Sequence, residues 1–349
     1  MNSAKKAGLF LKHTSLMIIV IGLNSCAMRN QENSAGSTGA AVIGFYNVEN
    51  LFDTINDPNI LDEDFTPTGK LKWDMDRYRE KLGSLSKVIR IMGANGVPEI
   101  LGLCEIENRK VLEDLCDSLC VGNKKYSIIH KDSPDERGID VALLYLPSVF
   151  QEESSEWIKV VLDDVADPNT RDILYVKGKL LGEKVHLFVN HWPSRGGGQA
   201  ESEKNRLNAA GELGKRTDQI FASDKNALVI IMGDFNDYPK DKSLSDVLGV
   251  GNTANSQLYN MMALADSLGE GSYNYRGDWG TLDQFIISNS LFSGSGLSTS
   301  QEDAIIVRKD WMLFKKDDGS VTPNRTYAGD KYTGGISDHL PVTLKIRSK

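Results

Sequence analysis

The chain contains 349 residues, of which 40% are hydrophobic and 25% are charged. This composition is that of an ordinary globular protein, and it excludes disorder of the whole chain. The formal net charge of −8 provides no basic surface of the kind that binds a phosphate backbone non-specifically, so it argues against a passive nucleic-acid-coating role. A hydrolase that recruits divalent cations could still accept a polyanion, because the metal ions reverse the local charge.

The first 25 residues are typical of an export signal. Three lysines among the first 12 residues precede the apolar run Leu16–Leu23, which is shorter than the roughly 18 apolar residues of a membrane-spanning helix. The run ends at Asn24-Ser25-Cys26, which resembles a bacterial lipobox although Asn24 is unusual within it. We therefore expect residues 1–25 to be a lipoprotein signal peptide and Cys26 to be lipidated, with simple secretion or a buried cysteine as the alternatives.

The segment after this cysteine is expected to be a tether. Residues 26–40 are rich in Asn, Ser and Gly and contain too little apolar material to fold alone, whereas residues 41–349 read as one continuous domain. A lipid anchor would hold the protein at the bacterial cell envelope, on its periplasmic or outer surface, without spanning the membrane. The sequence predicts no protein partner, and no contact with the membrane other than the anchor.

Three cysteines remain within the domain, at positions 104, 116 and 120. Because their number is odd and no two of them form a CxxC motif, the sequence gives no sign of a disulfide framework or a zinc site. We expect free or buried thiols.

Short apolar runs alternate with helical patterns along the domain. The expected strands are rich in Val, Ile, Leu and Phe, and they cover Ala41–Tyr46, Ile100–Cys104, Asp140–Tyr145, Val185–Asn190, Ala227–Met232, Gln284–Ser288 and Pro341–Ile346. The expected helices cover Asp76–Met92, Asn108–Cys120 and Gln199–Ala222. This alternation predicts an α/β core of layered sheets, in which polar residues at the ends of strands are well placed to line a site.

Polar residues follow the first two expected strands directly. Asn47 begins the run Asn47-Val-Glu-Asn-Leu-Phe-Asp53, and Glu105 ends the apolar run Ile100–Cys104. A carboxylate at the end of a buried strand must be solvated, paired or bound to metal, because burying it unpaired is costly. Each residue also has a purely structural interpretation, since Asn and Asp form turns and Glu is favoured at a helix start.

The next two strand ends carry further candidates. His191 is followed by Ser194, Arg195 and three glycines, and such a turn allows backbone amides to approach an anion while the histidine donates to a phosphate oxygen. Asp234 and Asn236 follow the run Ala227–Met232. Their spacing of two places both side chains on one face, where a carboxylate and an amide could hold a nucleophilic water.

Two acid–histidine elements come last. Asp283 begins the run Asp283-Gln-Phe-Ile-Ile-Ser288, and Asp338 and His339 precede the final expected strand. An Asp–His pair with a second Asp to hold the imidazole suits acid–base or phosphate-stabilising chemistry. A surface Asp–His pair without a function is the alternative interpretation.

Taken in order, these six clusters resemble the endonuclease/exonuclease/phosphatase family. The resemblance spans Val42 to Ile346 and includes Gly-Asp-Phe-Asn at 233–236, Leu-Asp-Gln at 282–284 and Ser-Asp-His at 337–339. It implies a four-layer α/β sandwich, in which two mixed β-sheets pack face to face with helices outside. It also implies a metal-dependent phosphodiester hydrolase in which water attacks phosphorus in line.

The resemblance carries roles onto individual residues. Asn47, Glu105 and Asp338 match the metal-binding positions, and their oxygen ligands favour Mg²⁺ or Mn²⁺ over zinc. Asp234 and Asn236 match the pair that orients or deprotonates water. His339 matches the catalytic histidine held by Asp283, and His191 matches a second histidine that contacts phosphate.

Three arginines are candidates for substrate binding. Arg137 falls where some members carry a residue that contacts the scissile phosphate, although the adjacent Asp140 could be the functional group instead. Arg195 lies in the turn after His191, and Arg325 lies in a loop that leads into Ser337-Asp-His339.

The family does not fix the substrate. Local strings such as Asn190-His-Trp-Pro-Ser-Arg195 are most similar to a secreted bacterial nuclease branch, which predicts an extracytoplasmic enzyme that cleaves DNA or RNA. A sphingomyelinase-type or phosphoinositide-type phosphoesterase is the first alternative. Tyr273, Tyr275 and Trp279 could enter a bilayer, stack on bases or simply pack beneath Asp283. A non-catalytic binding protein on the same fold is a minor alternative, which the complete set of acids and histidines argues against.

Overall fold

The computed structural model describes Met1 and residues 39–349, apart from residues 95, 120–124, 164–168, 252–255 and 295. Cys26, the expected signal peptide and nearly all of the expected tether lie outside the described residues, and so does Cys120. Within these ranges, none of the helices combines the length and the apolar character that crossing a bilayer requires. Cys104 and Cys116 are free, as expected.

Two mixed β-sheets form the centre of the domain. The first has seven strands: β13 (Leu297–Ser298), β19 (Val342–Ser348), β1 (Ala40–Leu51), β2 (Ile100–Ile106), β4 (Asp140–Tyr145) and β3 (Ser127–His130) in that order, with β14 (Ala304–Ile306) also paired to β19. The second has six, in the order β5 (Phe150–Ile158), β6 (Ile173–Leu180), β7 (Glu183–His191), β8 (Leu228–Asp234), β12 (Asp283–Ser288) and β9 (Leu258–Asn260). Each sheet has a parallel pair at its centre, β1 with β2 and β7 with β8.

The remaining elements are helices and small hairpins. The helices are α1 (Met75–Ile89), α2 (Arg109–Leu119), α3 (Gln199–Ser223), α4 (Ala263–Ser267) and α5 (Ser290–Ser293), with single turns η1 (Glu63–Phe65), η2 (Ser243–Val247), η3 (Gln301–Asp303) and η4 (Asp310–Met312). The hairpins are β10 (Tyr273–Tyr275) with β11 (Asp278–Gly280), β15 (Leu313–Lys315) with β16 (Val321–Pro323), and β17 (Tyr327–Ala328) with β18 (Lys331–Tyr332).

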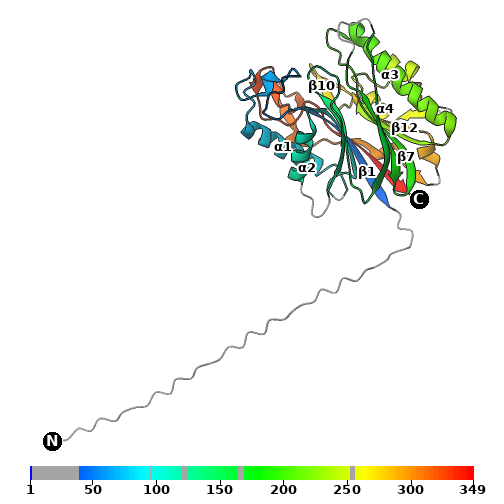
Figure 1. Ribbon diagram of the computed structural model, residues 1–349, viewed down its shortest axis with the longest axis horizontal. Coiled ribbons are helices and arrows are strands. Elements are labelled where there is room, and N and C mark those ends of the chain that lie inside the picture. Colours follow the sequence, from blue (N-terminus) through cyan, green and yellow to red (C-terminus); the bar gives the residue numbers. More distant parts are fainter. Residues whose placement is uncertain (2–38, 95, 120–124, 164–168, 252–255, 295) are drawn as a thin grey trace. The chain divides into compact units, whose positions relative to one another are not determined.

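Alternation of buried side chains along the central strands explains the layers. In β1, Ile43 and Phe45 face the other sheet, whereas Tyr46 and Val48 face α1 and α2. Both faces of the sheet are covered, which explains why β1 carries no polar side chain from Ala40 to Phe45. Figure 1 shows α1 and α2 on one side of the two sheets and α3 on the other. The expected four-layer α/β sandwich is confirmed.

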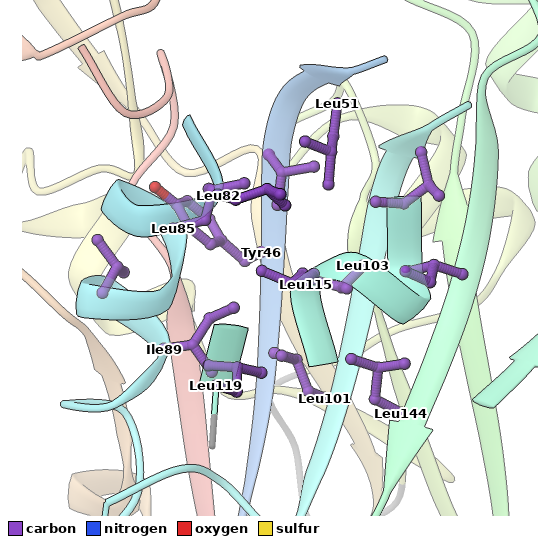
Figure 2. Close-up of a cluster of buried hydrophobic side chains, with 14 of the residues drawn as sticks. Tyr46, Leu51, Leu82, Leu85, Ile89, Leu101, Leu103, Leu115, Leu119 and Leu144 are labelled. Atoms are coloured by element: carbon purple, nitrogen blue, oxygen red, sulfur yellow. The ribbon is translucent and has the colours of Figure 1, made fainter. Parts of the chain in front are cut away.

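The outer layer beside the first sheet shows how sequence spacing produces this packing. Asp74 caps α1 by accepting a hydrogen bond from the backbone N–H of Arg77 at 3.0 Å. Leu82, Leu85 and Ile89 then fall on one helical face and pack onto the sheet (Figure 2). The helix therefore covers the apolar outer side of β1 and β2.

All seven expected strands and all three expected helices are present; the bounds of Asp140–Tyr145 are as expected, and those of the others are shifted. β1 continues to Leu51 through a register irregularity between Asn47 and Leu51, so Asn47 lies inside the strand. β5 and β6 were missed. The outward residues of β5 are mostly polar and exposed because it is an edge strand, which removes the apolar signal that marked the central strands.

Candidate active site

The candidate residues meet because of strand direction. Asn47, Glu105, His191 and Asp234 lie toward the C-terminal ends of the two central parallel pairs. The antiparallel strand β12 begins at Asp283, which is paired directly with Asp234. Both sheets thus deliver their polar strand ends to one edge of the sandwich.

The backbone is irregular at the points where these side chains must turn inward. Glu105 sits at a register shift between β2 and β4 with φ of 62°, and Asn236 has φ of 50°. Left-handed conformations cost energy for residues other than glycine and concentrate at functional sites. Gly233 is required next to Asn190, since a Cβ added at this glycine would lie 2.6 Å from the Asn190 Cβ.

His339 is held from two sides. Its Nδ1 lies 2.6 Å from Oδ2 of the fully buried Asp283, and the Ser272 hydroxyl donates to the same carboxylate oxygen. The ring of Tyr273 packs against the imidazole with centroids 4.8 Å apart. Asp283 at the start of β12 therefore orients the imidazole, and Tyr273 of the β10–β11 hairpin packs against the ring. Nε2 is left directed at the Asp234 carboxylate, 3.8 Å away.

The two histidines have opposite protonation preferences. Burial alone would lower the pKa of His339, but the carboxylates of Asp283 and Asp234 raise it well above the ordinary value. Burial lowers the pKa of His191, and the charges of Arg171 and Arg137 lower it further. His339 is therefore the cationic donor of the pair, and His191 is a neutral imidazole at neutral pH.

Asp234 occupies the centre of the cluster. Its Oδ1 accepts a hydrogen bond from the backbone N–H of Asn236 at 2.9 Å, and its Oδ2 accepts one from Nδ2 of Asn47 at 3.0 Å. Burial, opposed by His339, raises the pKa of Asp234 to about 6. A carboxylate with such a pKa can accept a proton from a water molecule near neutral pH.

Three residues were expected to bind metal, and two of them present carboxylates at the cavity, Glu105 and Asp338. Burial raises the pKa of Asp338, and the negative charge of Glu105 raises it further. A divalent cation between these oxygens would relieve the repulsion, and an all-oxygen donor set suits Mg²⁺ or Mn²⁺. Asn47 differs, since its Nδ2 faces Glu105 at 3.2 Å while its Oδ1 accepts the Glu49 N–H. A ligand role would require its amide to rotate.

A second group of potential ligands lines or underlies the same site and shares no residue with the first. Asp234, Asp283 and His339 offer ligand atoms within 4.8 Å of one another. His339 and Asp283 are hydrogen-bonded to each other through Nδ1 and Oδ2, so we interpret these two residues as an orienting pair. His130, Asp132 and Asp140 form another such group in and beside the β3–β4 connection, and there Asp140 accepts hydrogen bonds from within the loop.

The three candidate arginines occupy different surroundings. Arg137 lines the cavity with its side chain half exposed. Arg195 also lines the cavity, but it donates to the Asn236 carbonyl oxygen at 2.6 Å and packs over the Tyr238 ring. Arg325 is paired with Asp338 at 3.0 Å and borders a smaller neighbouring pocket. Arg137 is the least engaged of the three with other residues of the site, and direct substrate contact by all three stays a prediction.

A cavity of about 660 Å³ opens over these groups. Its wall includes Tyr273 and Tyr275 of the β10–β11 hairpin, together with Gly196–Gly198. The sequence had marked these tyrosines without placing either against the histidine. The roles of Ser272 and of the buried Arg171 were missed, because single Ser and Arg residues in ordinary-looking loops carry no motif.

The comparisons with known proteins agree with this geometry. The sequence model described as "Endonuclease/Exonuclease/phosphatase family" matches residues 42–348. The chain therefore belongs to the endonuclease/exonuclease/phosphatase family. A search of curated proteins finds no significant match.

Solved structures share the fold at low identity. A family protein from Bacteroides thetaiotaomicron is 13% identical over 90% of this chain and 97% of its own, with a TM-score of 0.56. The catalytic domain of human Nocturnin is 16% identical, covering 89% and 95%, at 0.52. A mannosyl-6-phosphatase of B. thetaiotaomicron VPI-5482 is 14% identical, covering 88% and 99%, at 0.52. Together, family and fold define the protein as a hydrolase of phosphate esters.

Proposed function

We propose that the protein is a metal-dependent phosphodiesterase that cleaves nucleic acid. The observation that carries this proposal is the pairing of a cationic His339 with a buried Asp234 carboxylate, with Nε2 and Oδ2 3.8 Å apart, at one open cavity. Such a pair supplies a hydrogen-bond donor for the developing negative charge and a base for the attacking water. No covalent intermediate is required.

The surrounding residues complete the assignment. Asn236 assists Asp234 in orienting the water, and His191 and Arg137 contact the phosphoryl oxygens. Glu105 and Asp338, with Asn47, would hold Mg²⁺ or Mn²⁺, which supplies Lewis-acid stabilisation of charge on phosphorus. Asp283 keeps His339 protonated and oriented.

The form of the cavity favours a substrate that extends beyond the phosphate. Tyr275 is 56% exposed and lies at the cavity wall beside the Arg276 guanidinium. Exposed aromatic and arginine side chains are suited to stacking on bases. Together with the nuclease-like strings of the sequence, this supports DNA or RNA over a small phosphate ester. The expected lipid anchor at Cys26 would place this activity outside the cytoplasm.

Two other substrate classes remain candidates. A sphingomyelinase-type or phosphoinositide-type activity would use the same tyrosines at a lipid surface. Hydrolysis of a sugar phosphate is suggested by the structural similarity to a mannosyl-6-phosphatase. A sugar phosphate is a small monoester, and it would leave the exposed Tyr275 without a contact.

A substrate panel tests the proposal. Purified protein would be incubated with plasmid DNA, RNA, sphingomyelin, a phosphoinositide and mannose 6-phosphate, each with Mg²⁺ or with EDTA. We expect Mg²⁺-dependent cleavage of nucleic acid that is lost in His339→Ala and retained in His186→Ala, which removes a histidine remote from the cavity. Turnover of a lipid or sugar phosphate alone would refute the nuclease assignment, and inactivity on all five substrates would refute phosphoester hydrolysis of these classes.

A further inference from the structure

A buried arginine outside the assigned set connects both halves of the site. Arg171 precedes β6 in the six-stranded sheet and is 5% exposed. Its Nη1 donates to Oδ2 of Asp135 at 2.9 Å, and its Nη2 donates to the carbonyl oxygen of Trp192 at 2.7 Å. Asp135 belongs to the β3–β4 connection of the other sheet, so this guanidinium bridges the two sheets at the edge where the site lies.

Each partner of Arg171 holds a residue of the proposed machinery. Oδ1 of Asp135 accepts the backbone N–H of Arg137 at 3.0 Å and its Nε at 3.3 Å. On the other side, the Trp192 carbonyl oxygen also accepts Nδ2 of Asn236 at 3.0 Å. The planar, always-charged guanidinium of Arg171 is thus linked through Asp135 to Arg137, and through the Trp192 carbonyl oxygen to the side-chain amide of Asn236.

The position of this bridge matters because most of the packing between the sheets is apolar. At this edge a second polar link joins them, the hydrogen bond from Nδ2 of Asn47 to Oδ2 of Asp234 at 3.0 Å. Packing among residues such as Phe45 and Met232 is non-directional. A guanidinium with two fixed donor directions has one matching arrangement of acceptors. Burial raises the pKa of Asp135, but Arg171 and Arg137 together hold it below the ordinary value, so the carboxylate stays charged.

We propose that Arg171 is a positioning residue, which sets the place of Arg137 relative to Asn236 across the two sheets. The effect on catalysis rests on the proposed function, but the effect on structure does not. The loops around Arg137 and Asn236 belong to different sheets, and we expect both to loosen when Arg171 is lost.

Hydrogen exchange tests whether Arg171 couples the two loops, and it does not require a measurable enzymatic activity. The backbone amides of Arg137 and Asn236 both donate to carboxylates, Asp135 and Asp234. In Arg171→Met we expect both amides to exchange about tenfold faster or more, because local opening becomes easier, while central β8 amides such as that of Ile231 are unchanged. Faster exchange at one loop alone, or equally throughout the domain, would overturn the proposal.

Two further variants separate positioning from simple loss of folding. Arg171→Lys keeps a charge beside Asp135 but lacks the fork that reaches two acceptors, so Asn236 should loosen while Arg137 stays protected. Full protection of both amides in this variant would contradict the bridge. The combination of Arg171→Met with Asp135→Asn leaves no unpaired buried charge, and so it should fold while still loosening Asn236. Arg216→Met, which removes an arginine paired with Glu156 away from the cavity, is the matched control.

Kinetics then test the catalytic consequence on bis(4-nitrophenyl) phosphate with Mg²⁺. We expect Arg171→Met to lower kcat/KM by about tenfold or more in the wild-type background, since small misplacement of reacting groups is costly. When Arg137 and Asn236 are already alanine, the same change should cost less than about twofold. Equal losses in both backgrounds would show that Arg171 acts through stability. If the wild type does not hydrolyse this diester, the exchange result decides the positioning, and the substrate panel decides the proposed function.

Discussion

The sharpest prediction concerns Asp283, the carboxylate that accepts a hydrogen bond from His339, the proposed catalytic histidine. Asp283→Asn keeps the shape of the side chain but removes the charge that accepts the Nδ1–H of His339 at 2.6 Å. Both residues are buried, so solvent screens the interaction little. A hydrogen bond to a charged group contributes about 1.5–3 kcal/mol. At about 1.36 kcal/mol per pKa unit, its loss should lower the pKa of His339 by roughly one to two units.

The sign of the effect follows from the raised pKa of His339. The imidazolium is the active form in the proposed mechanism, and therefore activity falls as pH rises through this pKa. In Asp283→Asn, that alkaline fall should begin one to two pH units lower, by roughly the amount worked out above. Stability contributed by the pairing is present below the unfolded pKa of about 6.5 and is lost as pH rises through the folded pKa.

Two measurements check the prediction. The pH dependence of kcat for diester hydrolysis gives the alkaline limb, and NMR titration of the His339 ring in the metal-free protein gives its pKa without relying on activity. Ser272→Ala is the matched control, because it removes a neutral donor to the same carboxylate oxygen and should shift the limb much less. An unmoved limb together with an unmoved ring titration would refute the assignment of Asp283 as the residue that keeps His339 charged.

Other consequences of the geometry are equally testable. Glu105→Gln should weaken Mn²⁺ binding about tenfold or more, measured by calorimetry. The melting temperature of the metal-free protein should not fall, because the change relieves repulsion with Asp338. A clear loss of stability with unchanged affinity would contradict the ligand role. Since the pKa of Asp234 is raised to about 6, activity should fall as pH drops through this region. Higher Mg²⁺ concentrations should move this acid limb of the pH profile to lower pH. An acid limb near pH 4 at limiting Mg²⁺ would show that this carboxylate is not the base. Gly233→Ala should cost about 1–3 kcal/mol of unfolding free energy in urea, because its Cβ would lie 2.6 Å from that of Asn190; a neutral effect would mean that β7 and β8 can separate locally.

Patterns in the sequence predicted the central strands and most of the polar residues that line the cavity. Runs of β-branched and aromatic residues marked the strands buried on both faces, and the polar residues at their ends, such as Glu105 and Asp234, stood out against them. Those signals are local, since a few neighbouring residues decide whether a segment can be a buried strand. Edge strand β5, with its polar outward face, gave no such signal.

The tertiary structure alone decided which groups touch and which protonation state each prefers. The contact of His339 with Tyr273 joins segments more than sixty residues apart. The pKa values depend on burial and on charges brought together by folding, so one histidine, His339, favours the cationic form and the other, His191, favours the neutral form. Arg171 shows the same limit, because its bridge between the sheets exists only once both sheets have packed, and no local pattern encodes a partner across that interface.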